Sequence, residues 1–434
     1  MSVGERTRER QQEPEASGGS TPTTRRRRGD RSLAVVAAVA VLALLAAAGI
    51  AAVSTDHIVV PVPVTETTLG SIACSASDRC IAVGASGSRY TIRVPYAVHV
   101  AGSWAIQSPP PPIENGNSFL LSLSCVRDAP CVSVGGQEMP APYLGAKSGG
   151  NRPLVEVWNG HAWRLEKVPV PSGTTDGELA GVGCVGQACM AVGGFSNKSG
   201  SGRVMTDYWD GSTWKLIVPP RPRTMEDPRL AAVSCTSPTS CTGVGQYTFD
   251  LGFGTLIAPL ILRWNGTQWR FEQSGRLGNA QDTMLNAVDC PSQNLCVTVG
   301  SQRTAGATYR TIAEIRHGDA WRVTPTTDPR HTPDADLVAL DCWSATACVA
   351  VGYSIAQGAP VPLVEWWDGT RWTLGSAPTV PGADGSALSG VSCAAADACV
   401  ATGNFRHATP TEHAFTALWN GKHWTVTPAP EPPS

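Results

Sequence analysis

Fourteen cysteines carry the most reactive side chains of this sequence, and they fall into seven close pairs. Six pairs have the spacing C-x5-C and one has C-x4-C, and the first cysteines recur at steps of 51, 59, 51, 55, 52 and 51 residues. Thiols at such spacing form disulfides or bind a metal, and zinc sites typically combine C-x2-C pairs with histidine. No C-x2-C occurs here and no histidine recurs with the pairs. We therefore expect no metal and one disulfide in each pair: Cys74–Cys80, Cys125–Cys131, Cys184–Cys189, Cys235–Cys241, Cys290–Cys296, Cys342–Cys348 and Cys393–Cys399.

Acidic residues form a second pattern, because each segment that leads into a first cysteine carries one or two of them. Two interpretations remain open. The acids accept backbone N–H bonds where the chain turns into a strand, or they form a charged ring that attracts a cation or a basic partner segment. The acids of this candidate ring are Glu66, Glu114, Asp176, Glu178, Asp227, Asp282, Asp334, Asp336 and Asp384.

The elements that position these residues are short strands in a repeat of about 50 residues, which indicates a repeat architecture. Each repeat contains four strands. The first ends at the first cysteine, after a small or short residue such as Ser124 or Gly183, and the second opens with a Cys-x-x-x-Gly sequence. The third is apolar and ends on Trp, and an Asn-Gly or Asp-Gly turn leads to a second Trp that opens the fourth. Two repeats depart from this pattern: the fifth has Arg316 in place of the first Trp, and the first is shortened to Val100-Ala-Gly-Ser-Trp104.

Four antiparallel strands repeated seven times predict an all-β chain, a seven-bladed β-propeller. The repeats start near residues 69, 120, 179, 230, 285, 337 and 388. A solenoid is the alternative, but it needs terminal repeats with polar outer faces, and the first and last repeats are no more polar than the others. We expect the tryptophans to pack between blades. Platforms for sugar stacking are the alternative, which is less favoured because all the tryptophans lie at one repeat position.

The repeat resembles two known families. Gly193-Gly194 at the end of a second strand, with Trp209 and Trp214 further on, resembles the kelch repeat. The stretch Tyr208–Trp214 is similar to the end of the Asp-box of sialidase-type propellers, although Tyr208 stands where that motif has Ser. The cysteine pair is not a kelch feature. The resemblance covers residues 69–434 and implies the fold alone, since both families include binding proteins and enzymes.

Strand alternation places all short turns on one face of the disc and all long, variable loops on the other. Binding residues usually lie on variable loops held by a rigid scaffold, and aromatic and Arg side chains are the usual interface anchors. The candidate ligand face therefore comprises Tyr90, Tyr143, Phe195, Arg203, Arg223, Tyr247, Phe249, Phe253, Arg303, Tyr309, Arg310, Arg330, Tyr353, Phe405 and Arg406.

The N-terminal 68 residues differ from the repeats. Residues 1–32 are polar, Arg-rich and without apolar periodicity, which predicts disorder. Residues 33–53 are apolar and uncharged, long enough for one transmembrane helix, although a cleaved signal peptide remains an alternative. The Arg-rich flank predicts a cytoplasmic N-terminus, with a linker at 54–68 and an extracellular propeller at the plasma membrane. Arg outnumbers Lys 28 to 5, which is typical of a bacterium with a high-GC genome.

No combination of residues in the sequence points to a catalytic mechanism. A net charge of −2 gives no global field for nucleic acid, and no cofactor motif occurs. We therefore expect a membrane-anchored, non-catalytic module that binds a protein or glycan ligand at the cell surface. The alternative is a surface glycosidase or lyase, which requires paired carboxylates roughly 5 to 9 Å apart at the channel mouth.

Overall fold

The computed structural model describes residues 66–431, apart from residues 77–78, 88–93, 101–103, 108, 111–116, 128, 140–149, 222–223, 251, 253, 278–281, 305–307, 331 and 408–410. The chain divides into two units, residues 1–60 and 61–434. The predicted tail, the apolar span and most of the linker lie outside the described residues. Within the described part there is no helix with the length and apolar character to cross a bilayer.

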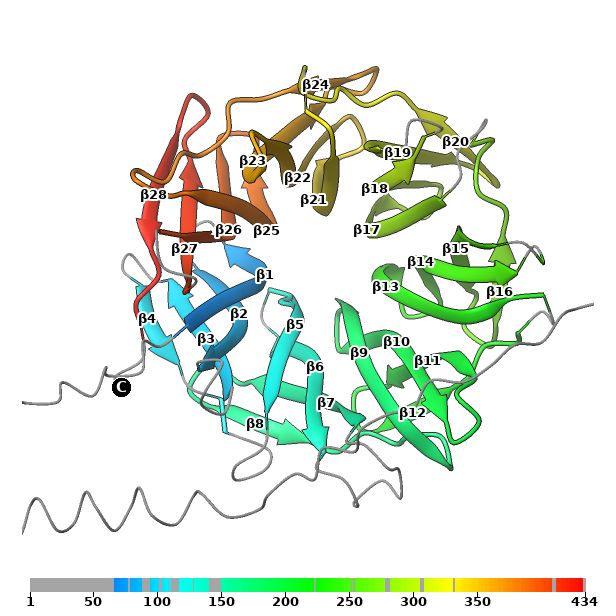
Figure 1. The fold of residues 1–434 in the computed structure, drawn as a ribbon. Helices are drawn as coiled ribbons and strands as arrows, with labels where there is room; N and C mark the ends of the chain where they lie inside the picture. Colours follow the sequence, from blue (N-terminus) through cyan, green and yellow to red (C-terminus); the bar gives the residue numbers. More distant parts are fainter. Residues whose placement is uncertain are drawn as a thin grey trace, which may run out of the picture. The chain divides into compact units, whose positions relative to one another are not determined.

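The second unit is a seven-bladed propeller, as the repeats predict. Each of seven sheets contains four antiparallel strands that follow one another in the chain, and Figure 1 shows the sheets around a central axis with the first strand of each innermost. The innermost strands begin a few residues before the predicted repeat starts. The first three blades are β1 (Glu66–Ala76), β2 (Arg79–Gly87), β3 (Val94–Val100) and β4 (Trp104–Gln107); β5 (Ser118–Ser124), β6 (Cys131–Met139), β7 (Gly150–Trp158) and β8 (Trp163–Glu166); and β9 (Thr174–Val185), β10 (Ala188–Asn197), β11 (Gly202–Trp209) and β12 (Trp214–Ile217).

The other four blades repeat this order. Their strands are β13 (Glu226–Ser237), β14 (Ser240–Asp250), β15 (Thr255–Trp264) and β16 (Trp269–Glu272); β17 (Asp282–Ser292), β18 (Leu295–Arg303), β19 (Tyr309–His317) and β20 (Ala320–Thr324); β21 (Ala335–Ser344), β22 (Ala347–Ala356), β23 (Ala359–Trp367) and β24 (Trp372–Leu374); and β25 (Gly385–Ala395), β26 (Ala398–Arg406), β27 (Glu412–Trp419) and β28 (Trp424–Pro428).

All seven predicted disulfides are present, and each joins the innermost strand of a blade to its second strand. In the sixth blade, for example, Cys342 and Cys348 are direct cross-strand partners. The described residues contain no free cysteine. Each bridge therefore cross-links the two arms of the first hairpin of its blade, whose first strand lines the axis of the ring.

A β-bulge at the same place in every innermost strand explains the Cys-x-x-x-Gly sequence. In the sixth blade the register shifts between Leu337 and Ala339, and Leu337 faces Gly352 on the second strand. The bulge pushes the carbonyl of the residue before this Leu against the glycine. A Cβ on Gly352 would lie 2.0 Å from the carbonyl oxygen of Asp336, and at the seven equivalent glycines this distance is 1.8–2.4 Å. Only glycine fits there.

The Asn-Gly and Asp-Gly sequences predict positive φ in the Trp-to-Trp turn, and the structure has it at the glycine but not at the Asx residue. Trp367 and Trp372 pair in register, which leaves a four-residue loop between them. Only Gly369 has a positive φ, of 91°. Asp368 contributes through its side chain, because its Oδ1 accepts the backbone N–H groups of Thr370 and Arg371. The sequence therefore predicted the turn correctly but not the conformation of its first residue.

The ring closes by side-chain contacts between the first and seventh blades, since each blade is built from consecutive strands. The backbone N–H of Leu69 donates to Asn404 Oδ1 at 2.9 Å, and Ser389 Oγ donates to the Leu69 carbonyl at 2.5 Å. On the outer side, the Tyr96 hydroxyl donates to the carbonyl of Pro430. These contacts exclude the open solenoid.

Candidate functional site

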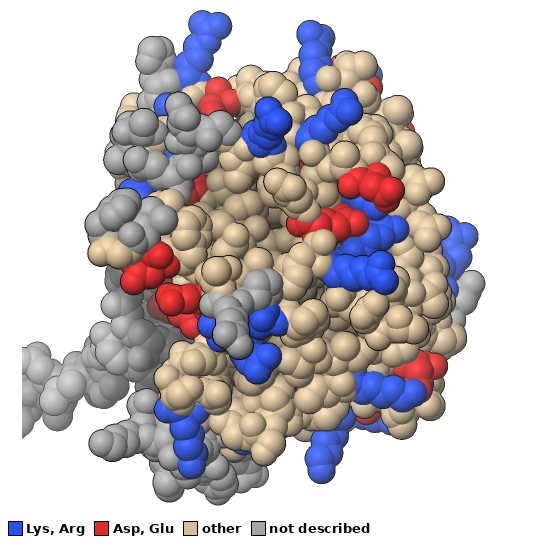
Figure 2. Space-filling model, turned by 90° about the vertical axis from the view of Figure 1, so that its right-hand side faces the viewer, with Lys and Arg blue, Asp and Glu red and all other residues tan. Residues whose placement is uncertain are grey.

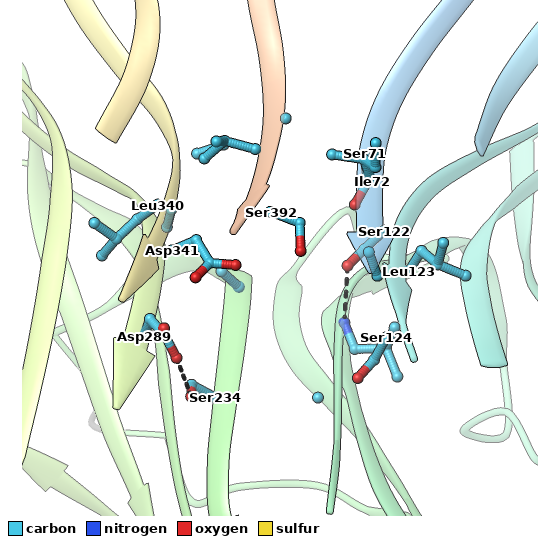
Figure 3. A pocket seen from close by; sticks show the side chains of 18 of the residues that line it. Ser71, Ile72, Ser122, Leu123, Ser124, Ser234, Asp289, Leu340, Asp341 and Ser392 are labelled. Carbon is cyan, nitrogen blue, oxygen red and sulfur yellow. Dashed lines mark hydrogen bonds between the residues drawn. The ribbon is translucent and has the colours of Figure 1, made fainter. Parts of the chain in front are cut away.

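The central channel has a volume of about 490 Å³ and is lined by all seven innermost strands. The bulged residue of every blade contributes to the lining, and these residues are mostly small: Gly70, Leu121, Ala180, Ala231, Asn286, Val338 and Ser389. Figure 3 shows further side chains from the next positions, among them serines and two aspartates, that project from different strands toward the axis. The channel is therefore narrow, polar and built from repeat-equivalent positions.

In five of the seven blades, the side chain of the residue before the first cysteine links neighbouring blades at the short-turn end of the channel. Ala73 and Gly183 occupy this position in the other two blades and have no side-chain hydrogen-bonding group. Ser124 Oγ accepts the backbone N–H of Cys184 in the next blade at 3.0 Å. The same contact recurs from Ser234 to Cys290, at 3.1 Å, and from Ser392 to Cys74 across the ring closure, at 3.2 Å. These residues are short because their side chains must reach a backbone amide of the next blade.

Asp289 and Asp341 occupy this linking position in the fifth and sixth blades. Asp289 Oδ2 accepts the N–H of Cys342 at 2.9 Å, and its Oδ1 accepts Ser234 Oγ at 3.1 Å and the Cys290 N–H at 2.8 Å. Asp341 Oδ2 accepts the Cys393 N–H at 3.2 Å. Figure 3 shows both carboxylates on neighbouring strands inside the channel.

The two channel aspartates influence each other's protonation. Burial raises the pKa of Asp289, although three hydrogen bonds oppose the shift. Burial, and then the charge of Asp289, raise the pKa of Asp341 to about 7. The pair therefore favours a proton on Asp341 near neutral pH. The sequence offered one signal for this pair, namely two acids at a position that is otherwise Ser, Gly or Ala.

Four acids of the candidate ring accept backbone N–H bonds from the third strand of the preceding blade. Asp176 accepts from Asn151 at 2.7 Å, Asp227 from Gly202 at 2.9 Å, Asp282 from Ile257 at 2.9 Å, and Asp334 from Tyr309 at 2.8 Å. None of the four lines the channel. Asp282 also forms an ion pair of 2.6 Å with Arg303. These four acids thus accept backbone N–H groups, but from residues 25 positions earlier in the adjacent blade rather than from the local turn of an Asx cap.

Asp336 contacts a residue that lines the channel. Its Oδ1 accepts the side-chain amide of the channel residue Asn286 at 2.8 Å. Burial raises the pKa of Asp336 to about 6. Tyr353 lies nearby, and burial followed by the charges of Asp336 and Asp334 raises its pKa. This group marks the long-loop end of the channel between the fifth and sixth blades.

Glu178 and Asp384 have other surroundings. Burial is the main cause of the raised pKa of Glu178, with the charge of Asp176 adding to it. The amide of Asp384 donates to the carbonyl of Arg406. Glu66 opens β1, and Glu114 lies outside the described residues.

The candidate ligand face is brought together only in part. Tyr247 and Phe249, near the end of β14, are half-buried and in ring contact, with centroids 6.2 Å apart. In the next two blades Arg310 donates to the carbonyl of Thr332, and Tyr353 ends near the acids described above. These residues stand on second and third strands near their long-loop ends, so the scaffold fixes them.

Other residues predicted for this face have different positions. Phe195 and Phe405 are only 9% and 7% exposed and belong to the hydrophobic core. Arg203, Arg330 and Arg406 are exposed. Tyr90, Tyr143, Arg223 and Phe253 lie outside the described residues. Seen from the edge of the ring in Figure 2, basic and acidic residues are interspersed over a mostly uncharged surface.

Four further acids are completely buried in third strands, two residues before the turn. Glu314 accepts the Ser274 hydroxyl and the Gly275 N–H, and Glu365 accepts the Thr327 N–H, in each case from the chain that leaves the preceding blade. Both carboxylate oxygens of Glu156 and of Asp207 have no hydrogen-bond partner among the described residues. Burial raises the pKa of Glu156 to about 8 and that of Asp207 to about 7.

Similarity to a solved polysaccharide lyase supports the propeller fold. No protein-family model matches the sequence, and no curated protein matches it. Among solved structures, a polysaccharide lyase that is an ulvan lyase bound to -[GlcA(1-4)Rha3S]- has a TM-score of 0.56 at 11% identity, over 83% of this chain and 96% of that one. The fucose-specific lectin from Aleuria aurantia has a TM-score of 0.40 at 11% identity, over 72% of this chain and 96% of the lectin.

Proposed function

We propose that this chain is a non-catalytic binding propeller, anchored in the plasma membrane of a bacterium, that takes a protein or glycan ligand on its long-loop face. The observation that carries the proposal is the use of its acids. The carboxylates at and near the channel hold neighbouring blades together through backbone N–H groups. A glycosidase or lyase needs carboxylates whose oxygens are free to meet the substrate.

The channel pair illustrates this difference. Asp289 uses both oxygens to accept hydrogen bonds from Ser234, Cys290 and Cys342. Asp341 accepts the N–H of Cys393 in the next blade. Removing such an acceptor leaves a buried donor unsatisfied, at a cost of roughly 1–3 kcal/mol. These contacts support a role for both aspartates in joining the blades.

The long-loop ends of the fourth to sixth blades have the chemistry expected of a binding surface. Tyr247 and Phe249 supply aromatic area, Arg310 and Tyr353 supply polar contacts, and all four stand on strands. Side chains held by a rigid scaffold lose little conformational freedom when a ligand binds. This arrangement supports ligand binding at that end of the ring.

The membrane assignment rests on the apolar residues 33–53 and the Arg-rich segment before them. Seven disulfides are consistent with an oxidising compartment outside the cytoplasm. An origin from kelch-like or Asp-box repeats agrees with the Asp-Gly turns. Protease added to intact cells should digest residues 69–434 and leave residues 1–32 protected; the reverse pattern contradicts the orientation.

Binding without catalysis can be tested on the purified full chain in detergent. We expect the protein to be retained by an immobilised protein or glycan from the envelope of the same bacterium. That ligand should be recovered chemically unchanged. Uronate-containing and neutral polysaccharides should show no new reducing ends and no unsaturated products above a blank without protein. Product release that disappears in Asp341→Asn, with folding retained, would instead establish the glycosidase or lyase alternative.

A further inference from the structure

A second cavity lies between the second and third blades on the short-turn face, and it shares only Cys184 with the lining of the channel. Its volume is about 170 Å³, and its lining includes Arg164 and Glu166 of β8, Gln187 of the β9–β10 turn, and Trp209 and Trp214. Pockets for drug-sized molecules have about 300–1,000 Å³. This cavity therefore suits one small group.

The equivalent junction between the fourth and fifth blades shows what can fill this place. There Glu272 corresponds to Glu166, three residues after the second Trp of its blade, and Arg316 corresponds to Trp209. Glu272 Oε2 accepts Arg316 Nε at 3.1 Å and the Trp321 indole N–H at 2.8 Å. Arg316 is only 2% exposed. At this junction Arg316 and Trp321 of the fifth blade therefore both donate to Glu272 of the fourth blade, so the Glu and the Trp have partners within the chain.

At the junction between the second and third blades these groups are used differently. Glu166 pairs at 2.5 Å with Arg164 of its own strand, and the Arg164 side chain is 71% exposed. The indole N–H of Trp214 is buried and has no partner among the described residues. Trp163 and Trp372 share this property, but the preceding blade there has Gln107 or Thr324 in place of Glu166.

The chemistry of the cavity selects a neutral ligand with both hydrogen-bond donors and acceptors. A cation would meet the Arg164 guanidinium, and an anion would meet the Glu166 carboxylate. Neighbouring hydroxyls of a sugar ring can accept from the guanidinium and donate to the carboxylate at once. The C–H face of such a ring packs on indole, and the rings of Trp209 and Trp214 lie 5.6 Å apart at 45°.

We propose that this junction binds a single neutral sugar ring, such as a terminal hexose or deoxyhexose of a glycan. The site is independent of the long-loop face, because it lies at the opposite ends of the strands. It requires no reaction, only the cavity, the Arg164–Glu166 pair and the two indoles.

The test uses the folded full chain and a panel of methyl glycosides of glucose, galactose, mannose and fucose. Saturation-transfer NMR and tryptophan fluorescence titration should identify at least one glycoside that binds. The variant Trp209→Arg introduces the residue that the fifth blade has at this position. Its guanidinium should bind the Glu166 carboxylate, as Arg316 binds Glu272, and reduce the affinity for the glycoside at least tenfold. Glu272→Gln, at the filled junction, is the matched control and should leave affinity unchanged.

Two variants of the Arg164–Glu166 pair test the proposal even if Trp209→Arg does not fold. Arg164→Ala and Glu166→Gln alter half-exposed or exposed side chains, and each should weaken binding by several fold with an unchanged melting temperature. The proposal is overturned if no glycoside binds, or if binding is equal in the wild type and all three variants. Preferential binding of methylguanidinium over every glycoside would likewise overturn it.

Discussion

Asp207 lies fully buried in β11 without a hydrogen-bond partner among the described residues, which predicts an unusual dependence of stability on pH. Burial raises the pKa of its carboxyl from 3.8 to about 7. Below pH 4 the folded and unfolded forms are both protonated. Between pH 4 and 7 only the unfolded form ionises, so stability falls as pH rises, and above pH 7 the loss levels off.

The size of this effect follows from the shift in pKa. At about 1.4 kcal/mol per pKa unit, the change from 3.8 to about 7 corresponds to at most roughly 4 kcal/mol. Asp207→Asn keeps the shape of the side chain and removes its ionisation. The variant should therefore resemble the wild type near pH 4 and become more stable by up to that amount above pH 7.

Urea denaturation followed by tryptophan fluorescence, at intervals from pH 4 to 8.5, measures this difference. Asp397→Asn makes the same chemical change at an exposed residue and should give a small difference that does not grow with pH. A constant difference between Asp207→Asn and the wild type across the range would refute the assignment of a buried, protonated carboxyl.

Three further predictions concern the repeat itself. Gly352→Ala should destabilise the fold by about 1–3 kcal/mol through overpacking against the Asp336 carbonyl, whereas Gly254→Ala, in open space, should change the urea midpoint little. Asp227→Ala should lower the free energy of unfolding by about 1 kcal/mol, and Asp227→Asn by much less, because the Asn side chain can still accept the Gly202 N–H. Equal losses of stability in the two variants would instead indicate that the charge of Asp227 matters. Replacing both Cys342 and Cys348 by Ala should cost about 2 kcal/mol and leave six bridges in non-reducing peptide maps, and any bridge between blades would contradict the pairing.

The fold could be predicted because its determinants are local and periodic. The cysteine pairs, the Gly four residues after each second cysteine and the Trp-to-Trp turns recur at a fixed spacing. The disulfides and the glycines act within their own blade, whereas the tryptophans pack against the preceding blade, as expected. The short residues before the first cysteines were also visible. Their reason was not, because Ser124 bonds to Cys184, 60 residues later and in another blade.

The candidate site could be predicted less well, because its properties depend on contacts between blades. Arg316 is an exception in the repeat pattern, and only the structure shows that it pairs with Glu272. The aromatic residues Phe195 and Phe405 have the composition of a binding face but belong to the core. Nothing in a strand's own sequence distinguishes Glu314, which has partners across the blade junction, from Asp207, which has none among the described residues.

Photo-crosslinking on living cells tests the proposed binding face most directly. A photoreactive amino acid replaces Tyr247 or Tyr353 on the long-loop face in two variants, and His423, in a short turn of the seventh blade, in a third. The account predicts that the first two variants capture the same partner and that the third captures none of it. Capture from His423 alone, or equal capture from all three positions, would contradict the long-loop face as the binding surface.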